Sequence, residues 1–301
     1  MKRPDLFSCC MILIVGAMWG LHGPAIKLAY KAGFTFPQVV LFEYAVGGLV
    51  FGGVVLLQNR TLPKSNPRFW ATMVLAALEG CSVPLFLFWA YDLGPVSIAA
   101  TVFFLYVPLT QLLNLILTGR LPCRRELASM VLVVAGAAIS SEVLGSAHLQ
   151  NLRGVPCALL AALGFASFFV TTSRLGEEAT PAFRSFFFSL VACPIVLAAS
   201  FAAGWPLVPH VSLVPALSWI LVLGVGGQVV PVFLLVRFVP RTGSGLGSIL
   251  ASLELPVAVA TSALILGDPL GKAQVLGVLL VLAGIALPNL PRSTSTAARA
   301  A

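Results

Sequence analysis

The chain consists of long apolar runs separated by short polar connections. Ten runs have about the length that spans a bilayer as a helix and carry few charges. Their approximate cores are residues 6–29, 36–57, 69–91, 96–118, 127–144, 154–173, 183–203, 213–236, 244–266 and 273–290. The fifth and the tenth are short. The pattern predicts an all-α integral membrane protein with ten transmembrane helices, connected by short loops rich in Gly, Pro and Arg.

The composition agrees with a membrane protein and leaves little sequence for a soluble domain. Of the 301 residues, 59% are hydrophobic and 9% are charged, and the mean hydropathy is +1.01, whereas about a quarter of residues are charged in soluble proteins. The final stretch, residues 291–301, is short and polar, and we expect a disordered cytoplasmic tail. The first run is longer than the apolar region of a signal peptide and lacks an obvious cleavage site, so we expect it to be retained.

The distribution of basic residues indicates the orientation. Of the 18 Lys and Arg residues, the odd-numbered connections hold only Lys27, Lys31, Arg153 and Lys272. Basic residues concentrate on the cytoplasmic side of membrane proteins, so both termini are expected in the cytoplasm. We expect a multi-pass protein of the plasma membrane, which in a bacterium is the inner membrane. The net charge of +8 needs no nucleic acid to explain it.

Motifs for enzymatic chemistry and for cofactors are weak or absent. The six Cys residues show no C-x-x-C spacing, and His22, His148 and His210 are scattered, so no metal site or cofactor is expected. The segment "RTGSGLGS" places Thr242 where a G-x-S-G serine motif needs Gly, and both Asp92 and Asp268 lie at span ends. An intramembrane enzyme is therefore disfavoured. The nucleotide-binding motif G-x-x-x-x-G-K-[ST] does not occur in the sequence. If the chain carries a solute across the membrane, the energy would therefore come from an ion gradient or from exchange.

The chain also repeats itself at an offset of 148 residues. This offset aligns "VLVVAGAAI" (131–139) with "LLVLAGIAL" (279–287) and, without a gap, Pro108 with Pro256 and Gly119 with Gly267. We therefore expect two five-helix repeats, at 1–145 and 150–290. Because five is odd, the second repeat would enter the membrane inverted, an architecture that many secondary transporters use for alternating access.

Three segments resemble the EamA-type branch of the drug/metabolite transporter superfamily. They are "MWGLHGPAIK" (18–27), "LGPVSIAATVFFLYVP" (93–108) and "LELPVAVATSALILGDPLGKAQVLGVLLVLAGIAL" (253–287). The last is the most specific, because the family typically shows L-E-x-P, L-G-E, Q-x-x-G and a final A-G. The resemblance implies ten helices, cytoplasmic termini and export or import of small metabolites. The chain departs from the pattern at Asp268, at Arg120, and at Glu43 and Tyr44, where the family often has Arg.

Glu254 is the leading candidate for a functional group, since ionisable residues at membrane depth are costly. It lies near the middle of its span, two residues before Pro256, and the repeat places Tyr106 at its counterpart and Pro108 at the counterpart of the proline. Each proline removes a helix hydrogen bond and is expected to bend its span. Two alternatives stay open for Glu254: a protonated side chain that joins two helices, or a cavity residue that contacts substrate or carries a proton.

Other intramembrane polar residues are weaker candidates. Glu79 has Gly227 at its counterpart, beside Gln228, and a site role and a structural pair are equally favoured. Glu43 is closer to the outer surface, and Lys27 is a candidate partner. Trp19 and His22 share a face with Gly16, Gly20 and Gly23, which indicates either close helix packing with an interfacial tryptophan or a substrate or proton contact. Trp89, Tyr91, Phe103 and Phe104 are expected to face lipid or the core.

These observations favour a secondary transporter for a small polar or amphipathic metabolite, with amino acids preferred and efflux as the expected direction. The expected partners are a small-molecule substrate, the lipid bilayer and protons, without nucleic acid. The small-residue faces of the fifth and tenth spans, with Gly136, Gly277 and Gly284, would pack together or form a homodimer. The alternative readings are a channel, a non-transporting membrane scaffold and, less favoured, an intramembrane enzyme.

Overall fold

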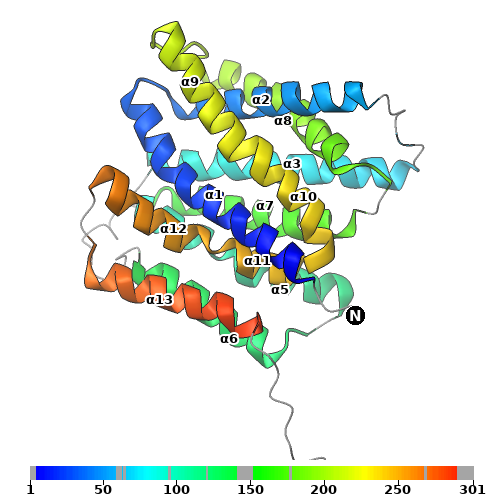
Figure 1. The fold of residues 1–301 in the computed structure, drawn as a ribbon, viewed down its shortest axis with the longest axis vertical. Coiled ribbons are helices and arrows are strands. Elements are labelled where there is room, and N and C mark those ends of the chain that lie inside the picture. The colour runs from blue at the N-terminus through cyan, green and yellow to red at the C-terminus, as the bar shows by residue number, and fades with distance from the viewer. Residues whose placement is uncertain are drawn as a thin grey trace, which may run out of the picture.

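The computed structural model describes residues 5–58, 63, 66–93, 96–119, 121–140, 152–175, 178–267 and 270–289, and every regular element in these ranges is a helix. The elements are α1 (Leu6–Lys31), α2 (Phe36–Leu57), α3 (Pro67–Leu93), α4 (Val96–Phe103), α5 (Tyr106–Thr118), α6 (Arg124–Ser140), α7 (Val155–Arg174), α8 (Pro181–Ala203), α9 (Leu213–Leu223), the π-helix η3 (Gly224–Val229), α10 (Val230–Thr242), α11 (Ser244–Ala251), α12 (Glu254–Thr261), the π-helix η4 (Ser262–Leu266), α13 (Lys272–Ala286) and the 3-10 helix η5 (Leu287–Asn289). The helices lie side by side, with α2 and α8 paired near one end of the stack and α6 and α13 paired at the other (Figure 1).

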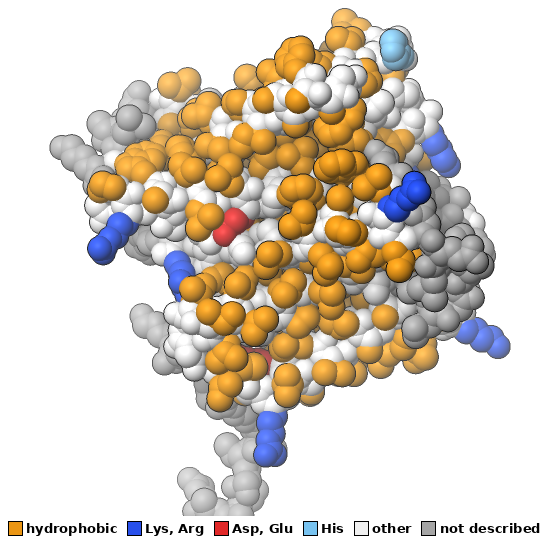
Figure 2. Space-filling view, turned by 180° about the vertical axis from the view of Figure 1, so that it is seen from behind, with side chains coloured by type: hydrophobic (Ala, Val, Ile, Leu, Met, Phe, Trp, Pro, Cys, Tyr) orange, Lys and Arg blue, Asp and Glu red, His pale blue; other side chains and the backbone are white. Residues whose placement is uncertain are grey.

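Eight helical stretches are long and apolar enough to cross a membrane. They are Leu6–Lys31, Phe36–Leu57, Pro67–Tyr91, Ile98–Thr118, Val155–Arg174, Pro181–Ala203, Leu213–Thr242 and Ser244–Ile265. The fifth and tenth predicted spans are also helical, but α6 has 17 residues and α13 has 15, fewer than the roughly 20 that cross the hydrocarbon core. Figure 2 shows the corresponding surface, which is mostly hydrophobic with basic side chains at its margins. The chain is therefore a helical, multi-pass membrane protein.

Several sequence predictions fall on residues that the structure leaves undescribed. These are the terminal part of the fifth predicted core (141–144), Arg120, His148, Asp268 and the tail at 291–301, all of which lie outside the described residues.

The fourth and ninth predicted spans are interrupted at equivalent positions. One break falls at 104–105 between α4 and α5, and the other falls at 252–253 between α11 and α12, 148 positions later. The turn hydrogen bonds of the two breaks correspond as well. Leu105 N–H donates to Val102 O at 3.1 Å, and its counterpart Leu253 N–H donates to Leu250 O at 3.2 Å. Val107 N–H donates to Phe104 O, and its counterpart Leu255 N–H donates to Ser252 O, both at 3.2 Å. Each break begins four residues before a proline, Pro108 or Pro256, whose ring would clash with a helix carbonyl at that position. Pro24, Pro84 and Pro194, in contrast, lie inside continuous helices. The two spans that were expected to bend are thus interrupted beside their prolines, but a proline alone does not produce a break.

The two interrupted spans also end alike. Gly119 follows α5 with φ of 67°, and Gly267 follows η4 with φ of 72°. Glycine is preferred at this left-handed position because it has no Cβ to collide with the backbone. The offset of 148 therefore describes the backbone as well as the sequence, so the internal repeat is a structural one.

The small-residue faces of the fifth and tenth spans pack against each other within one chain. A Cβ on Gly136 would lie 2.6 Å from the carbonyl oxygen of Gly277, and the Ser129 hydroxyl donates a hydrogen bond to the carbonyl of Gly284. Such contact requires the helix backbones to approach closely. These glycines therefore offer no free face to a second copy, and a homodimer stays a prediction without support from them.

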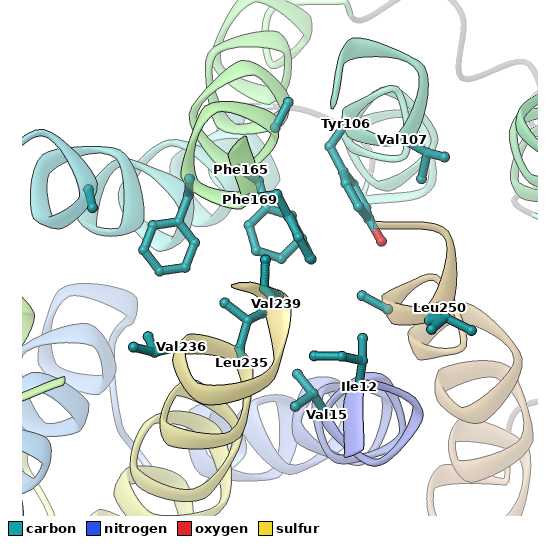
Figure 3. Packing of buried hydrophobic residues seen from close by; sticks show 14 of the residues in the cluster. Ile12, Val15, Tyr106, Val107, Phe165, Phe169, Leu235, Val236, Val239 and Leu250 are labelled. Atoms are coloured by element: carbon teal, nitrogen blue, oxygen red, sulfur yellow. The ribbon is translucent and has the colours of Figure 1, made fainter. Parts of the chain in front are cut away.

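An aromatic core fills the bundle beside the break between α4 and α5. Tyr106 is completely buried, and its ring lies 4.8 Å from that of Phe165 and 6.1 Å from that of Phe169 between centroids. Figure 3 shows these rings together, with the Tyr106 hydroxyl directed toward the helix that carries Leu250. The hydroxyl donates to the carbonyl oxygen of Ser248 at 3.3 Å, so this tyrosine joins α5 to α11.

Candidate functional site

A cavity of about 520 Å³ lies between helices of the two halves. Its wall is formed by side chains of α1, α2, α3, α4, α7, α8, η3, α10, α12 and η4. Five of the residues predicted from the sequence line it: Trp19, His22, Glu43, Gln228 and Glu254. The volume is in the range of small-molecule sites, which are mostly apolar with a few polar groups. The fold thus gathers polar groups from distant parts of the chain around one space.

Glu254 is placed on this wall by the break in the ninth predicted span. It is the first residue of α12. The N–H groups of Leu255 and Val257, which follow it, are hydrogen-bonded to the carbonyl oxygens of Ser252 and Leu253. In the described part of the chain, no residue donates a hydrogen bond to its carboxyl. The side chain lines the cavity together with Tyr91. The break therefore places Glu254 at the start of a helix on the cavity wall.

The backbone next to Glu254 is packed tightly on α1. A Cβ on Gly20 would lie 2.6 Å from the carbonyl oxygen of Glu254, and one on Gly16 would lie 2.7 Å from that of Ala251. The Thr261 hydroxyl donates to the carbonyl oxygen of Gly20 at 3.3 Å. The predicted close packing through Gly16 and Gly20 is confirmed, and it is made by backbone and hydroxyl groups rather than by the glutamate side chain.

Glu43 contacts His22 rather than Lys27. The distance from Nε2 of His22 to Oε1 of Glu43 is 2.8 Å, and both side chains are about nine-tenths buried. The two atoms lie within salt-bridge distance, and the contact is an ion pair only when His22 is protonated; Oε1 has no hydrogen-bond donor of acceptable geometry among the described residues. The imidazole rests on Gly227, where any Cβ would overlap its ring. Lys27 was the candidate partner from the sequence, and the structure pairs Glu43 with His22 instead.

Trp19 also reaches the π-helix η3. Its indole N–H donates to the carbonyl oxygen of Gly227 at 3.0 Å, and its ring packs edge-on against Phe165 at 5.5 Å. It is therefore a cavity residue and not an interfacial tryptophan. The wide turn of a π-helix is often found at functional sites, and here it presents a backbone carbonyl to Trp19 and the Gln228 side chain to the cavity.

Tyr106 and Glu79 lie away from the cavity. Tyr106 is behind its wall, bonded to Ser248 as described above. Oε1 of Glu79 accepts a hydrogen bond of 3.1 Å from the Thr171 hydroxyl, which joins α3 to α7. Its Oε2 has no hydrogen-bond partner among the described residues. The arrangement of Glu79 fits the structural pair better than a cavity contact.

Aromatic residues form much of the wall. Phe103 and Phe104 belong to the buried core, and Trp89 is 42% exposed, as the sequence indicated. The sequence did not indicate that Tyr91, Phe103 and Phe104 also line a cavity. The apolar pattern does not indicate which aromatic residues face the cavity, because a cavity-facing phenylalanine and a lipid-facing one look alike in an apolar run.

Metal ligation has no support in the part of the chain that the structure describes. No group of three or more His, Cys, Asp or Glu residues there is arranged to hold a metal ion. The described wall of the cavity carries polar, charged and aromatic side chains.

One comparison with known proteins identifies a family. The model of the EamA-like transporter family matches the chain twice, over residues 6–141 and 152–290. One solved structure, described only as "Crystal structure of protein", superposes with a TM-score of 0.77 over 94% of this chain and 98% of its own, at 17% sequence identity; this likeness shows the fold alone. A search of curated proteins gives no match.

Proposed function

The chain belongs to the EamA-like transporter family, within the drug/metabolite transporter superfamily, and we propose that it is a secondary transporter working by alternating access. The observation that carries this proposal is the cavity of about 520 Å³ between the two halves, with Glu254, His22, Glu43, Trp19 and Gln228 on its wall. Transporters with inverted repeats bind substrate at such an interface.

The proposed topology has ten transmembrane helices in two inverted five-helix repeats, 1–145 and 150–290, with both termini and the tail at 291–301 in the cytoplasm. Support comes from the equivalent breaks after α4 and α11 and from the pairing of α6 with α13. The shorter α6 and α13 would then cross the membrane as a closely packed pair. The basic residues outside the odd-numbered connections support the orientation in the plasma membrane, the inner membrane of a bacterium.

The proposed substrate is a small polar or amphipathic metabolite, with amino acids and related compounds favoured. A largely apolar wall with a few polar groups suits a molecule that has both kinds of surface. We propose efflux driven by a proton gradient or by exchange, since the sequence has no nucleotide-binding motif.

The test is solute exchange by the purified full chain in liposomes. A thermal-shift screen across amino acids, nucleosides and sugar phosphates selects a solute, and labelled solute outside is then exchanged against unlabelled solute inside. Saturable counterflow is the expected result. Passive flux that does not saturate would replace the transporter with a channel, and the absence of flux for every solute would favour a scaffold.

A pair of glycine variants connects this assay to the cavity. Gly23 lines the cavity, and a Cβ built on it meets nothing within 4 Å. Gly23→Leu should therefore fill part of the cavity and lower counterflow without unfolding the protein. Gly53 is equally unobstructed but is not part of the cavity wall, so Gly53→Leu serves as the matched control and should transport normally.

A further inference from the structure

The charged groups on the cavity wall differ in whether a protein partner already contacts them. Glu43 lies 2.8 Å from His22. Glu254 has no hydrogen-bond donor within the described residues and no ion pair there. A carboxyl at the wall of a largely apolar cavity has little water to stabilise its charge, so a cationic ligand group is the strongest stabilising partner available to it. Glu254 is thus the acidic group on this wall that is free to bind such a ligand.

A structural role does not account for the Glu254 side chain. If it joined two helices, a donor on another helix would be in contact with it, as Thr171 is with Glu79 at 3.1 Å. The contact between α12 and α1 is made instead by the Thr261 hydroxyl and by close approach of the backbones at Gly20. The carboxyl is therefore available within the cavity.

The rings that share the cavity with Glu254 suit a cation as well. Tyr91, Phe103, Phe104 and Phe165 line the same cavity, and the faces of aromatic rings attract cations, more strongly when water is excluded. The same rings provide an apolar surface for the body of a ligand. An anionic ligand would be repelled by the Glu254 charge; of the basic residues on the wall, His22 already contacts Glu43, and Lys27 on α1 carries the other positive charge.

We propose that Glu254 binds the protonated amino group of the transported molecule, whose apolar or aromatic body lies against Tyr91, Phe103, Phe104 and Phe165. This inference rests on the proposed transport function and names the substrate class: amines and amino acids, in preference to carboxylic acids, sugars and phosphates. A charge-assisted contact between ammonium and carboxylate supplies the specificity. The amino group can belong to an amino acid or to a simple amine, and Lys27 separates these two cases. Its side chain would pair with the carboxylate of an amino acid, whereas a simple amine has no carboxylate for it to bind.

Three probes of matched shape test this proposal by titration calorimetry on the full chain in detergent. Phenethylamine carries only the amino group, 3-phenylpropionate carries only the carboxylate, and phenylalanine carries both. The expected order is binding of phenethylamine and phenylalanine with at least about tenfold preference over 3-phenylpropionate. This comparison uses the unmodified protein, so it does not depend on the folding of any variant. Equal or tighter binding of 3-phenylpropionate would overturn the proposal.

The variants locate the contact. Glu254→Gln should weaken phenethylamine binding at least about tenfold, whereas Glu254→Asp, which keeps the charge, should restore part of the loss. Glu79→Gln is the matched control, an intramembrane glutamate outside the cavity wall, and should bind normally. Lys27→Met should weaken phenylalanine and leave phenethylamine unchanged if the carrier takes amino acids. Unchanged binding of phenethylamine by a folded Glu254→Gln protein would contradict the assignment.

The counterflow assay separates this proposal from the proposed function. If another solute shows saturable counterflow while neither amine binds, the recognition of amines by Glu254 is wrong and the transporter stands. If phenethylamine binds through Glu254 while no solute is exchanged, the binding site stands and the transport function is wrong.

Discussion

Nε2 of His22 lies 2.8 Å from Oε1 of Glu43, and this contact joins α1 to α2 at the wall of the cavity. Removal of one partner leaves the other as a buried polar group without a partner, a change that typically costs about 1–3 kcal/mol. His22→Phe and Glu43→Gln should each lower the stability of the purified protein in detergent. The double variant should lose less than the two single losses together, by about 0.5–3 kcal/mol. Strict additivity in this double-mutant cycle would mean that the two residues do not stabilise each other.

Gly227 should tolerate no side chain, because a Cβ there would overlap the His22 ring. Gly227→Ala is expected to displace His22, loosen its contact with Glu43 and reduce counterflow. The neighbouring Gly226, in the same π-helix, has nothing within 4 Å of an added Cβ, so Gly226→Ala should behave like the unmodified protein. Equal effects of the two substitutions would show that the π-helix backbone, and not the space beside His22, is what matters.

The pairing of α6 with α13 should be sensitive to a single methyl group. A Cβ on Gly277 would overlap the Gly136 carbonyl and the backbone of Ser140, atoms that move only if the helices separate. Gly277→Ala should therefore destabilise the protein by about 1–3 kcal/mol, measured as a lower unfolding temperature in detergent. Gly53→Ala is the control and should have little effect, since its surroundings are open. A stable Gly277→Ala protein would indicate that the two helices are not held together as described.

Binding of an amine should weaken as the pH is lowered, because a proton and an ammonium group compete for the Glu254 carboxylate. A single competing proton allows at most about a tenfold change in affinity per pH unit. Titration of phenethylamine at several pH values measures the slope, and Glu254→Gln should remove the part that belongs to Glu254.

Other titratable groups lie on the elements around Glu254: His22 and Lys27 on α1, Glu43 on α2, Tyr91 on α3, Tyr106 on α5 and Lys272 at the start of α13. A parallel titration of the His22→Phe protein separates the contribution of the His22–Glu43 pair. An unchanged slope in Glu254→Gln would assign the proton competition to one of these groups instead.

Most of the fold could be predicted from the sequence, because the bilayer imposes a simple rule on it. Apolar runs long enough to span must be helices that satisfy their own backbone hydrogen bonds, and the helices begin and end within a few residues of the predicted cores. The breaks fall before Pro108 and Pro256, which the sequence marks as sites of possible distortion, whereas Pro24, Pro84 and Pro194 lie inside continuous helices. The repeat at an offset of 148 residues is also present in the backbone, where Gly119 and Gly267 adopt the same left-handed conformation.

The tertiary structure decides which residues line the cavity. The sequence proposed seven polar or aromatic residues as site candidates, because a polar group inside a span has few favourable positions other than a cavity or a partner. Five of them line the cavity: Glu254, His22, Glu43, Trp19 and Gln228. The sequence could not separate these from Tyr106 and Glu79, which bond to Ser248 and Thr171 instead, and it offered Lys27 as a candidate partner of Glu43, whose neighbour is His22.

The sequence by itself thus determined the helices, the repeat and the small set of intramembrane polar residues, since each depends on a local pattern or on the cost of burying charge. Only the tertiary structure decided which of those residues meet. That choice depends on the rotation of each helix about its axis and on which glycines let backbones approach, as Gly20 does beside Glu254 and Gly227 does beneath His22. A one-dimensional apolar pattern does not distinguish the lipid from a cavity, because both accept the same side chains.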